Sequence, residues 1–203
     1  MAYHNFKLID LQKEFGLKIE QKNFLDAKQI RSSIPFGWTE EQAIHIDVAE
    51  LYSKTAPLRY IAWAILWEAE TNTPKNIVLW HDESLNADRL RKLNGRIDYM
   101  FLQRSDSLMK FAPLLCVTIT KANKKLEQHI ARVAAQMMGA QVFNQKYQQQ
   151  LPIIYGAITS GRTWLFLQLS QNTLTIDTNI YTYDDLPFLL GIFQHLLKPQ
   201  PFS

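Results

Sequence analysis

The sequences LLCVTITK (residues 114–121), LEQHIARVAAQMMGAQVF (126–143) and IIYGAIT (153–159) decide the fold class. The middle one repeats apolar residues at intervals of three and four, which predicts an amphipathic helix. The outer two are short and rich in β-branched residues, which favours strands, and the apolar start of the first favours burial on both faces. A strand, a helix and a strand in this order predict a right-handed crossover between parallel strands.

The flanking sequence extends this unit into a mixed sheet. Alternation over residues 96–102 predicts a strand with two different faces, because successive side chains of a strand point to opposite sides. One face carries Ile97, Tyr99 and Phe101, and the other carries Arg96, Asp98 and Met100. The other expected elements are a helix over residues 53–70, a short strand over 77–80, a loop over 82–92, a hairpin of 153–159 with 163–169, edge strands over 174–183 and a helix over 184–197. Together they predict an α/β fold with a mixed sheet flanked by helices.

The length of 203 residues fits one domain. We expect a helical or irregular N-terminal extension over residues 1–50, an α/β domain over 51–198 and a frayed tail over 199–203. No stretch has the roughly 18 consecutive apolar residues of a membrane helix, and the N-terminus lacks a signal-peptide pattern. The single cysteine, Cys116, excludes an intrachain disulfide and a cysteine cluster for a metal. These features predict a cytoplasmic protein without a membrane span. The sequence has no ATPase motif of the G-x-x-x-x-G-K-[ST] type, so we expect the protein to act alone, as a homodimer or with a protein partner.

The net charge of +3 conceals an uneven distribution along the chain. Residues 89–132 hold ten basic and three acidic side chains, a net charge of +7, so the remainder carries −4. A basic stretch of this kind is typical of a surface that contacts nucleic-acid phosphates. It also occurs as a solvated surface that keeps a protein soluble, and the charges alone leave both interpretations open.

Two residues of this basic stretch are candidates for chemistry. The carboxylate of Asp98, on the polar face of its strand, suits a divalent cation, or else an ion pair with Arg96 or another basic neighbour. The ammonium group of Lys121, at the end of the next strand, suits a phosphate in a transition state, or else solvent. The five histidines lack the spacing of a helical zinc site, and the seven glycines lack the clustering of a phosphate-binding loop.

Several short sequences, taken in order, resemble one known family. They are LNGRIDY (93–99), AAQMMGAQVFN (134–144), PIIYGAITSG (152–161) and DDLP (184–187). Together they are similar to a PD-(D/E)xK nuclease-like family that is common in cyanobacteria, whose members are often labelled restriction endonuclease subunit R-like. The resemblance covers about residues 50–198. It implies a restriction-endonuclease-like mixed sheet and an active site with an Asp on one strand and a Glu-x-Lys on the next, where two carboxylates hold Mg²⁺ against the scissile phosphate.

Within this resemblance Asp98 occupies the Asp position, but the Glu is missing. If Lys121 is the family's lysine, Ile119 stands in place of the Glu. A second register puts Thr120 at the Glu position and Ala122 at the lysine position. A third puts Thr118 and Thr120 there, and the family's helix Glu aligns with Arg59.

The resemblance therefore implies a catalytically degenerate nuclease, with Asp98 and Lys121 as vestiges of the active site and no cofactor. Such a pseudonuclease is expected to act as a nucleic-acid-binding or protein-interaction subunit. The residues expected to bind nucleic acid, DNA in most such enzymes, are Arg96, Lys124, Lys125 and Arg132. The alternative is an active nuclease that binds Mg²⁺ weakly through Asp98, with Lys121 and a migrated glutamate, Glu127 or Glu68.

Overall fold

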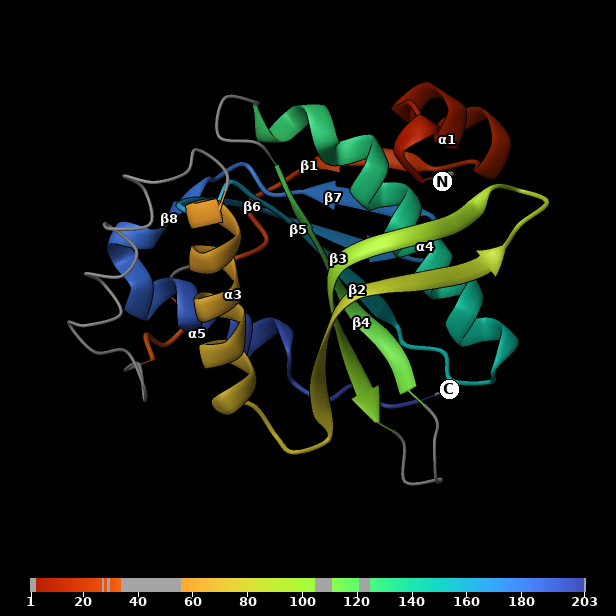
Figure 1. The fold of residues 1–203 in the computed structure, drawn as a ribbon. Helices are drawn as coiled ribbons and strands as arrows, with labels where there is room; N and C mark the ends of the chain where they lie inside the picture. Colours follow the sequence, from red (N-terminus) through yellow and green to blue (C-terminus); the bar gives the residue numbers. More distant parts are fainter. Residues whose placement is uncertain are drawn as a thin grey trace.

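The computed structural model describes residues 3–26, 28, 30–33, 56–104, 111–120 and 125–202, and within them eight strands form one mixed sheet (Figure 1). Seven of the strands follow the order β1-β7-β6-β5-β4-β3-β2, and β8 pairs with β6. The strands are β1 (Lys18–Gln21), β2 (Ile77–Asp88), β3 (Leu93–Arg104), β4 (Phe111–Ile119), β5 (Ile153–Thr159), β6 (Thr163–Ser170), β7 (Thr173–Ile176) and β8 (Tyr181–Thr182). The α-helices are α1 (Leu8–Phe15), α3 (Ala56–Thr71), α4 (Ile130–Lys146) and α5 (Leu186–Leu196), and the 3-10 turns are η1 (Tyr3–Asn5), η2 (Leu126–His129) and η3 (Tyr183–Asp185). The predicted α/β fold class is confirmed.

Helices cover both faces of the sheet. On one face α4 lies so close to β5 that a Cβ added at Gly156 would stand 2.7 Å from Val133 Cγ1. On the other face Phe193 of α5 packs against Phe101 of β3 and Phe166 of β6, and α3 lies beside α5 (Figure 1). The sheet is therefore enclosed by α4 on one side and by α3 and α5 on the other.

The strand–helix–strand unit forms as the sequence predicts. β4 and β5 pair in parallel, with α4 between them in the chain, and β5 and β6 form the predicted antiparallel hairpin. Residues 112–118 of β4 are all buried, as the apolar run predicts. The predicted faces of β3 are also confirmed, because Tyr99 stacks on Trp63 of α3 whereas Asp98 meets Arg132 of α4.

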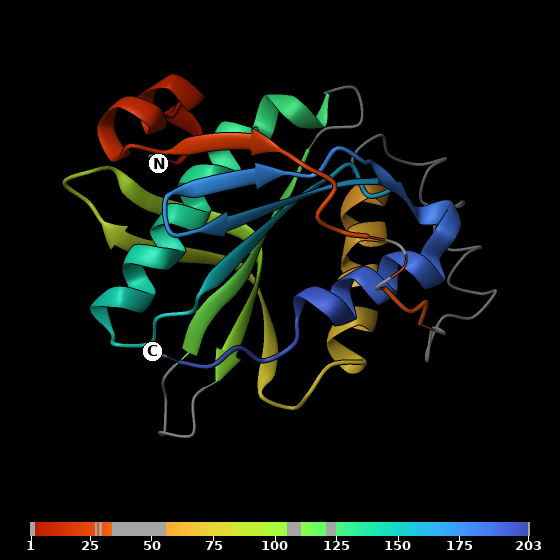
Figure 2. The same cartoon turned by 180° about the vertical axis from the view of Figure 1, so that it is seen from behind.

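Two predicted features at the edges of the sheet are wrong. The expected loop over residues 82–92 is mostly strand, because β2 continues to Asp88 and pairs with β3 as far as Leu93. β2 is an edge strand, so its charged residues point into solvent without breaking the pairing. At the other edge β1 pairs in parallel with β7 and covers it (Figure 2). The expected N-terminal extension thus supplies a strand to the sheet, while its expected helix start at residues 39–41 lies outside the described residues.

The C-terminal tail is anchored, in contrast to the frayed end that the sequence suggests. The Gln200 side chain exchanges two hydrogen bonds of 3.0 Å with the backbone of Ile153, at the start of β5. The Gln200 backbone exchanges two more with the side chain of Gln103 on β3, at 2.7 and 2.8 Å. The tail therefore bridges β3 and β5 beside the start of β4.

Candidate functional site around Asp98

Asp98 lies on the face of β3 that is covered by α4, and its carboxylate is held by the protein itself. Its Oδ2 accepts a hydrogen bond of 3.0 Å from the backbone N–H of Ile119 on β4. The same oxygen lies 3.4 Å from Nη2 of Arg132 on α4. Only 20% of the Asp98 side chain is exposed, so the interaction is shielded from bulk water. One carboxylate thus connects β3, β4 and α4.

The neighbouring position on β4 carries a neutral pair. Thr118 donates a hydrogen bond of 2.9 Å from its hydroxyl to Oε1 of Gln136 on α4, and both side chains are completely buried. The amide nitrogen of Gln136 donates in turn to the backbone carbonyl of Arg96, at 3.5 Å. The amide of Gln136 therefore joins the same three elements as Asp98, without any charge.

This geometry distinguishes between the three registers of the Glu-x-Lys motif. Thr118 points toward α4, so alternation along β4 turns Ile119 toward the opposite face of the sheet. The register with Ile119 at the Glu position is therefore incompatible with a site beside Asp98. The two registers that use Thr118 or Thr120 place a hydroxyl where the family has a carboxylate.

The two arginines that the sequence nominates for phosphate contact are both paired with aspartates. Arg132 forms an ion pair with Asp98, and Arg96 forms one with Asp82 on β2. Arg96 also donates a hydrogen bond of 2.9 Å to the backbone carbonyl of Asp82. These four residues line a pocket of about 230 Å³ together with Tyr3, His4 and Gly95. The opposite charges balance within the pocket, so it has no net positive charge to attract a phosphate.

Exposed cations of the described residues lie elsewhere. Arg89 and Lys92 are exposed in the turn between β2 and β3, where Arg91 pairs with Asp88 at 2.7 Å. Lys125 is exposed directly before η2. Lys121 and Lys124 lie outside the described residues.

Of the two candidates for a migrated glutamate, Glu68 is not placed to complete a metal site with Asp98. Glu68 is buried on α3, on the opposite side of the sheet from Asp98. Its Oε1 accepts a hydrogen bond of 2.9 Å from the side-chain amide of Asn72. Glu127 is exposed in η2. Among the residues that the structure describes, no three His, Cys, Asp or Glu side chains gather to hold a metal ion. A lone carboxylate that already faces a guanidinium does not fit Mg²⁺, which takes carboxylate oxygens free of a competing cation.

Cys116 behaves as the sequence suggests, as a core residue. It is fully buried in β4, and this burial raises the pKa of its thiol to about 12. The thiol is therefore protonated at neutral pH and is not a nucleophile.

Sequence reasoning found Asp98 but missed its environment. Gln136 was absent from the predicted site, and Thr118 entered it only as a stand-in for the family's Glu in one register, although both are polar residues within apolar stretches. A polar side chain in such a position requires a buried partner, and this is the signal that points to them. Asp82, which fell in the expected loop, carried no comparable signal.

No helix in the described part of the chain is long and apolar enough to cross a membrane. The sequence matches no known family model and no curated protein.

Proposed function

We propose that this protein is a catalytically inactive relative of PD-(D/E)xK nucleases that binds nucleic acid through exposed cations. The observation that carries this proposal is the use of Asp98 as a structural acceptor. Its Oδ2 is occupied by the Ile119 N–H and by Arg132, and the adjacent β4 position holds the neutral Thr118–Gln136 pair. Phosphodiester hydrolysis by this family's chemistry needs two carboxylates that clamp Mg²⁺, and a carboxylate beside a hydroxyl cannot form that clamp.

The binding part of the proposal rests on the positions of the cations. Arg89 and Lys92 in the β2–β3 turn and Lys125 before η2 are exposed, in a stretch of the sequence with a net charge of +7. Two further lysines, Lys121 and Lys124, precede Lys125 closely in the sequence. Cations that are exposed and free of a carboxylate can neutralise phosphates and release counterions from nucleic acid.

Cleavage is tested with purified protein and end-labelled DNA and RNA, in Mg²⁺ or Mn²⁺. We expect no cleavage by the wild type or by the Asp98→Ala variant. Metal-dependent cleavage that disappears in Asp98→Ala would show that the alternative, an active nuclease, is correct.

Binding is tested with single- and double-stranded DNA and RNA of one sequence over a salt series. We expect the affinity to fall as the salt concentration rises. Neutralising Lys121, Lys124 and Lys125 together should reduce the affinity. It should also reduce the slope of log affinity against log salt concentration, by about one unit for each phosphate that the variant no longer neutralises. A matched control is Lys13→Gln, Lys18→Gln and Lys22→Gln together, which also removes three exposed cations, on α1 and on and next to the edge strand β1. Equal losses in both variants, or no binding at about 50 mM salt, would contradict the proposal.

Exposed aromatic residues favour a second candidate function, that of a protein-interaction subunit. Tyr60, Trp63 and Trp67 recur at helical spacing on α3, and they are 43%, 36% and 44% exposed. Aromatic side chains are enriched at the centres of protein interfaces. If this protein forms a homodimer through α3, sedimentation equilibrium will show a dimer that Trp67→Ser weakens; a monomer at all concentrations would exclude it.

A further inference from the structure

The turn between β2 and β3 presents an exposed leucine among cations. Its four residues, 89–92, read Arg-Leu-Arg-Lys, and Leu90 is 96% exposed. Arg89 and Lys92 are exposed on either side of the leucine and form no ion pair with a described residue. Single exposed apolar residues are common on protein surfaces, so the meaning of this leucine depends on its surroundings.

The turn stands at the end of a two-stranded ribbon. β2 and β3 have 12 residues each, but β4 pairs with β3 only from Tyr99 to Arg104. Residues 93–97 of β3 therefore pair with β2 alone among the described strands. Figure 1 and Figure 2 both show the ribbon continuing past α4 to a turn at the outer end of the molecule, beside α1. The turn is thus accessible to a large partner.

Several interactions fix the shape of the turn. The backbone N–H of Lys92 donates 3.2 Å to the carbonyl of Arg89, which closes the turn. Asp88 accepts a hydrogen bond of 3.0 Å from the backbone N–H of Arg91 and another of 2.7 Å from its Nε. The Arg91 guanidinium also lies over the ring of Phe15 on α1, 5.8 Å from the ring centre. These contacts hold the tip in one conformation, which lowers the entropic cost of inserting it into a partner.

The charge of the ribbon changes sign away from its tip. Asp82 and Glu83 are exposed on β2, about 20 Å from the turn at the usual rise of a strand. A ribbon that lay lengthwise in the major groove of a nucleic acid would bring these carboxylates toward the phosphates. The free cations are at the tip instead, so the ribbon approaches a polyanion tip first.

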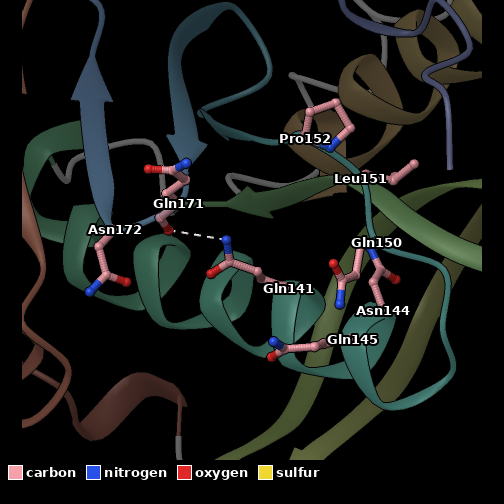
Figure 3. A pocket seen from close by; sticks show the side chains of 8 residues that line it. All are labelled: Gln141, Asn144, Gln145, Gln150, Leu151, Pro152, Gln171 and Asn172. Atoms are coloured by element: carbon pink, nitrogen blue, oxygen red, sulfur yellow. Dashed lines mark hydrogen bonds between the residues drawn. The ribbon is translucent and has the colours of Figure 1, made fainter. Parts of the chain in front are cut away.

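Two pockets of the described surface offer a phosphate backbone no comparable contact. The arginines of the pocket around Asp98 are paired with aspartates. A second pocket, of about 490 Å³, is lined by six Asn and Gln side chains with Leu151 and Pro152, and Figure 3 shows Gln141 bonded across it to the carbonyl of Gln171. None of its eight described lining residues is charged. Neither pocket therefore holds a cation that is free for a phosphate, unlike the turn.

We propose that the β2–β3 turn enters the minor groove of duplex DNA tip first, with Leu90 as an apolar wedge at a base step. Arg89 and Lys92 then reach phosphates on the two sides of the groove. An apolar side chain that enters this groove partly unstacks the step and bends the duplex toward the major groove. Pyrimidine–purine steps deform most easily, so the wedge favours them. This inference rests on the proposed nucleic-acid-binding function and deepens it.

The test uses the full chain and a duplex DNA of about two helical turns with a central TA step, which carries a dye at each end. Energy transfer between the dyes reports bending, and titration reports affinity. The main variant is Leu90→Ser, which removes the wedge and keeps every cation, and the exposure of Leu90 means that folding does not depend on it. The matched control is Ile180→Ser, at an apolar residue that is 51% exposed directly before β8.

We expect the wild type and Ile180→Ser to bend the duplex equally. Leu90→Ser should leave the duplex straight and bind it about tenfold more weakly, with an unchanged slope of log affinity against log salt concentration. Arg89→Gln with Lys92→Asn should lower that slope by about two units. Asparagine is chosen for residue 92 because it tolerates the left-handed backbone there, with φ at 61°.

The outcomes separate this inference from the function on which it rests. Binding without bending, or equal bending and affinity for Leu90→Ser, would overturn the wedge and leave nucleic-acid binding intact. Tighter binding to the single strand, or to duplex RNA with its wide, shallow minor groove, would do the same. No binding to any nucleic acid at about 50 mM salt would overturn both. Vesicles of phosphatidylcholine with phosphatidylserine are tested in parallel, and binding to them that Leu90→Ser weakens, without an effect on DNA, would assign the tip to a lipid surface instead.

Discussion

Oδ2 of Asp98 on β3 lies 3.4 Å from Nη2 of Arg132 on α4, and the same oxygen accepts the backbone N–H of Ile119 at 3.0 Å. The carboxylate therefore connects β3, β4 and α4 close to one edge of the sheet. An active-site carboxylate that awaits a metal is strained by repulsion from its neighbours, and removing it often stabilises the protein. The carboxylate of Asp98 instead has two favourable partners, so removing it should lower the free energy of unfolding, which can be measured.

Replacing Asp98 is expected to lower stability. Asp98→Ala leaves the Ile119 N–H and the Arg132 guanidinium without their acceptor, so the free energy of unfolding should fall by about 1–3 kcal/mol in urea denaturation. Asp98→Asn keeps an acceptor for Ile119 and should lose less. The control is Asp82→Asn, which still suits the left-handed backbone of residue 82 and removes the charge of an ion pair with Arg96 that is more than half exposed, so its loss should stay below about 1 kcal/mol. An Asp98→Ala protein more stable than the wild type would instead indicate a functional carboxylate.

The Thr118–Gln136 hydrogen bond is expected to show strong coupling in a double-mutant cycle. Thr118→Val and Gln136→Leu each leave one buried polar group without its partner, so each should destabilise the protein by about 1–3 kcal/mol. The double variant removes both groups, and its loss should be clearly smaller than the sum of the single losses. Additive losses would mean that the two side chains do not interact.

Gly156 on β5 is expected to tolerate no side chain. A Cβ at this position would lie 2.5 Å from Met137 Sδ and 2.7 Å from Val133 Cγ1, both on α4. Gly156→Ala should therefore push α4 away from the sheet and lower the free energy of unfolding by about 1–3 kcal/mol. Adding Val133→Ala makes room on the helix, so the combined loss should fall short of the two single losses added together. Thermal unfolding of the four proteins measures this.

Stability is expected to decline at alkaline pH because buried tyrosine and cysteine side chains resist ionisation, Tyr3 and Cys116 most strongly. Burial raises the pKa of the Tyr3 hydroxyl well above its usual range, and raises the pKa of the Cys116 thiol to about 12. Both pKa values are higher in the folded than in the unfolded chain, so their contribution is complete below the unfolded pKa values and is lost as the pH rises toward the folded ones.

The decline should begin near pH 9 and approach about 1.4 kcal/mol per pH unit for each group that is ionised only in the unfolded chain. Urea denaturation between about pH 8 and 10.5 measures the slope. Cys116→Ala and Tyr3→Phe should each remove one part of it. An unchanged slope in both variants would show that other groups are responsible.

The sequence predicts the centre of this fold better than its edges, for a physical reason. In β4, α4 and β5 the hydrophobic period and the buried positions agree, so local pattern and tertiary packing favour the same structure. β1 reads KIEQ, with one apolar residue, and it exists as a strand because its backbone pairs with that of β7. That pairing joins segments at opposite ends of the chain, which no local pattern records.

In the candidate site, too, one part could be predicted from the sequence and another could not. Asp98 could be found because it stands on the polar face of an alternating strand. The partner of Asp98 could not be predicted from the sequence. Arg96 is closer in sequence and on the same face of the strand, but it pairs with Asp82, and Asp98 pairs with Arg132 instead. The two pairings depend on how β2 and α4 lie against β3, and only the assembled sheet determines that.

The anchored tail gives a final prediction. Gln200→Ala removes both hydrogen bonds between its side chain and the Ile153 backbone, while leaving the backbone bonds to Gln103 possible. We expect the free energy of unfolding to fall by about 1–3 kcal/mol, and amide hydrogen exchange at Ile153 to accelerate, because that N–H loses its acceptor. Gln128→Ala serves as the control, since that glutamine is exposed on η2. If Gln200→Ala and the control have the same stability and the same exchange at Ile153, the tail is frayed in solution and the bridge between β3 and β5 does not persist.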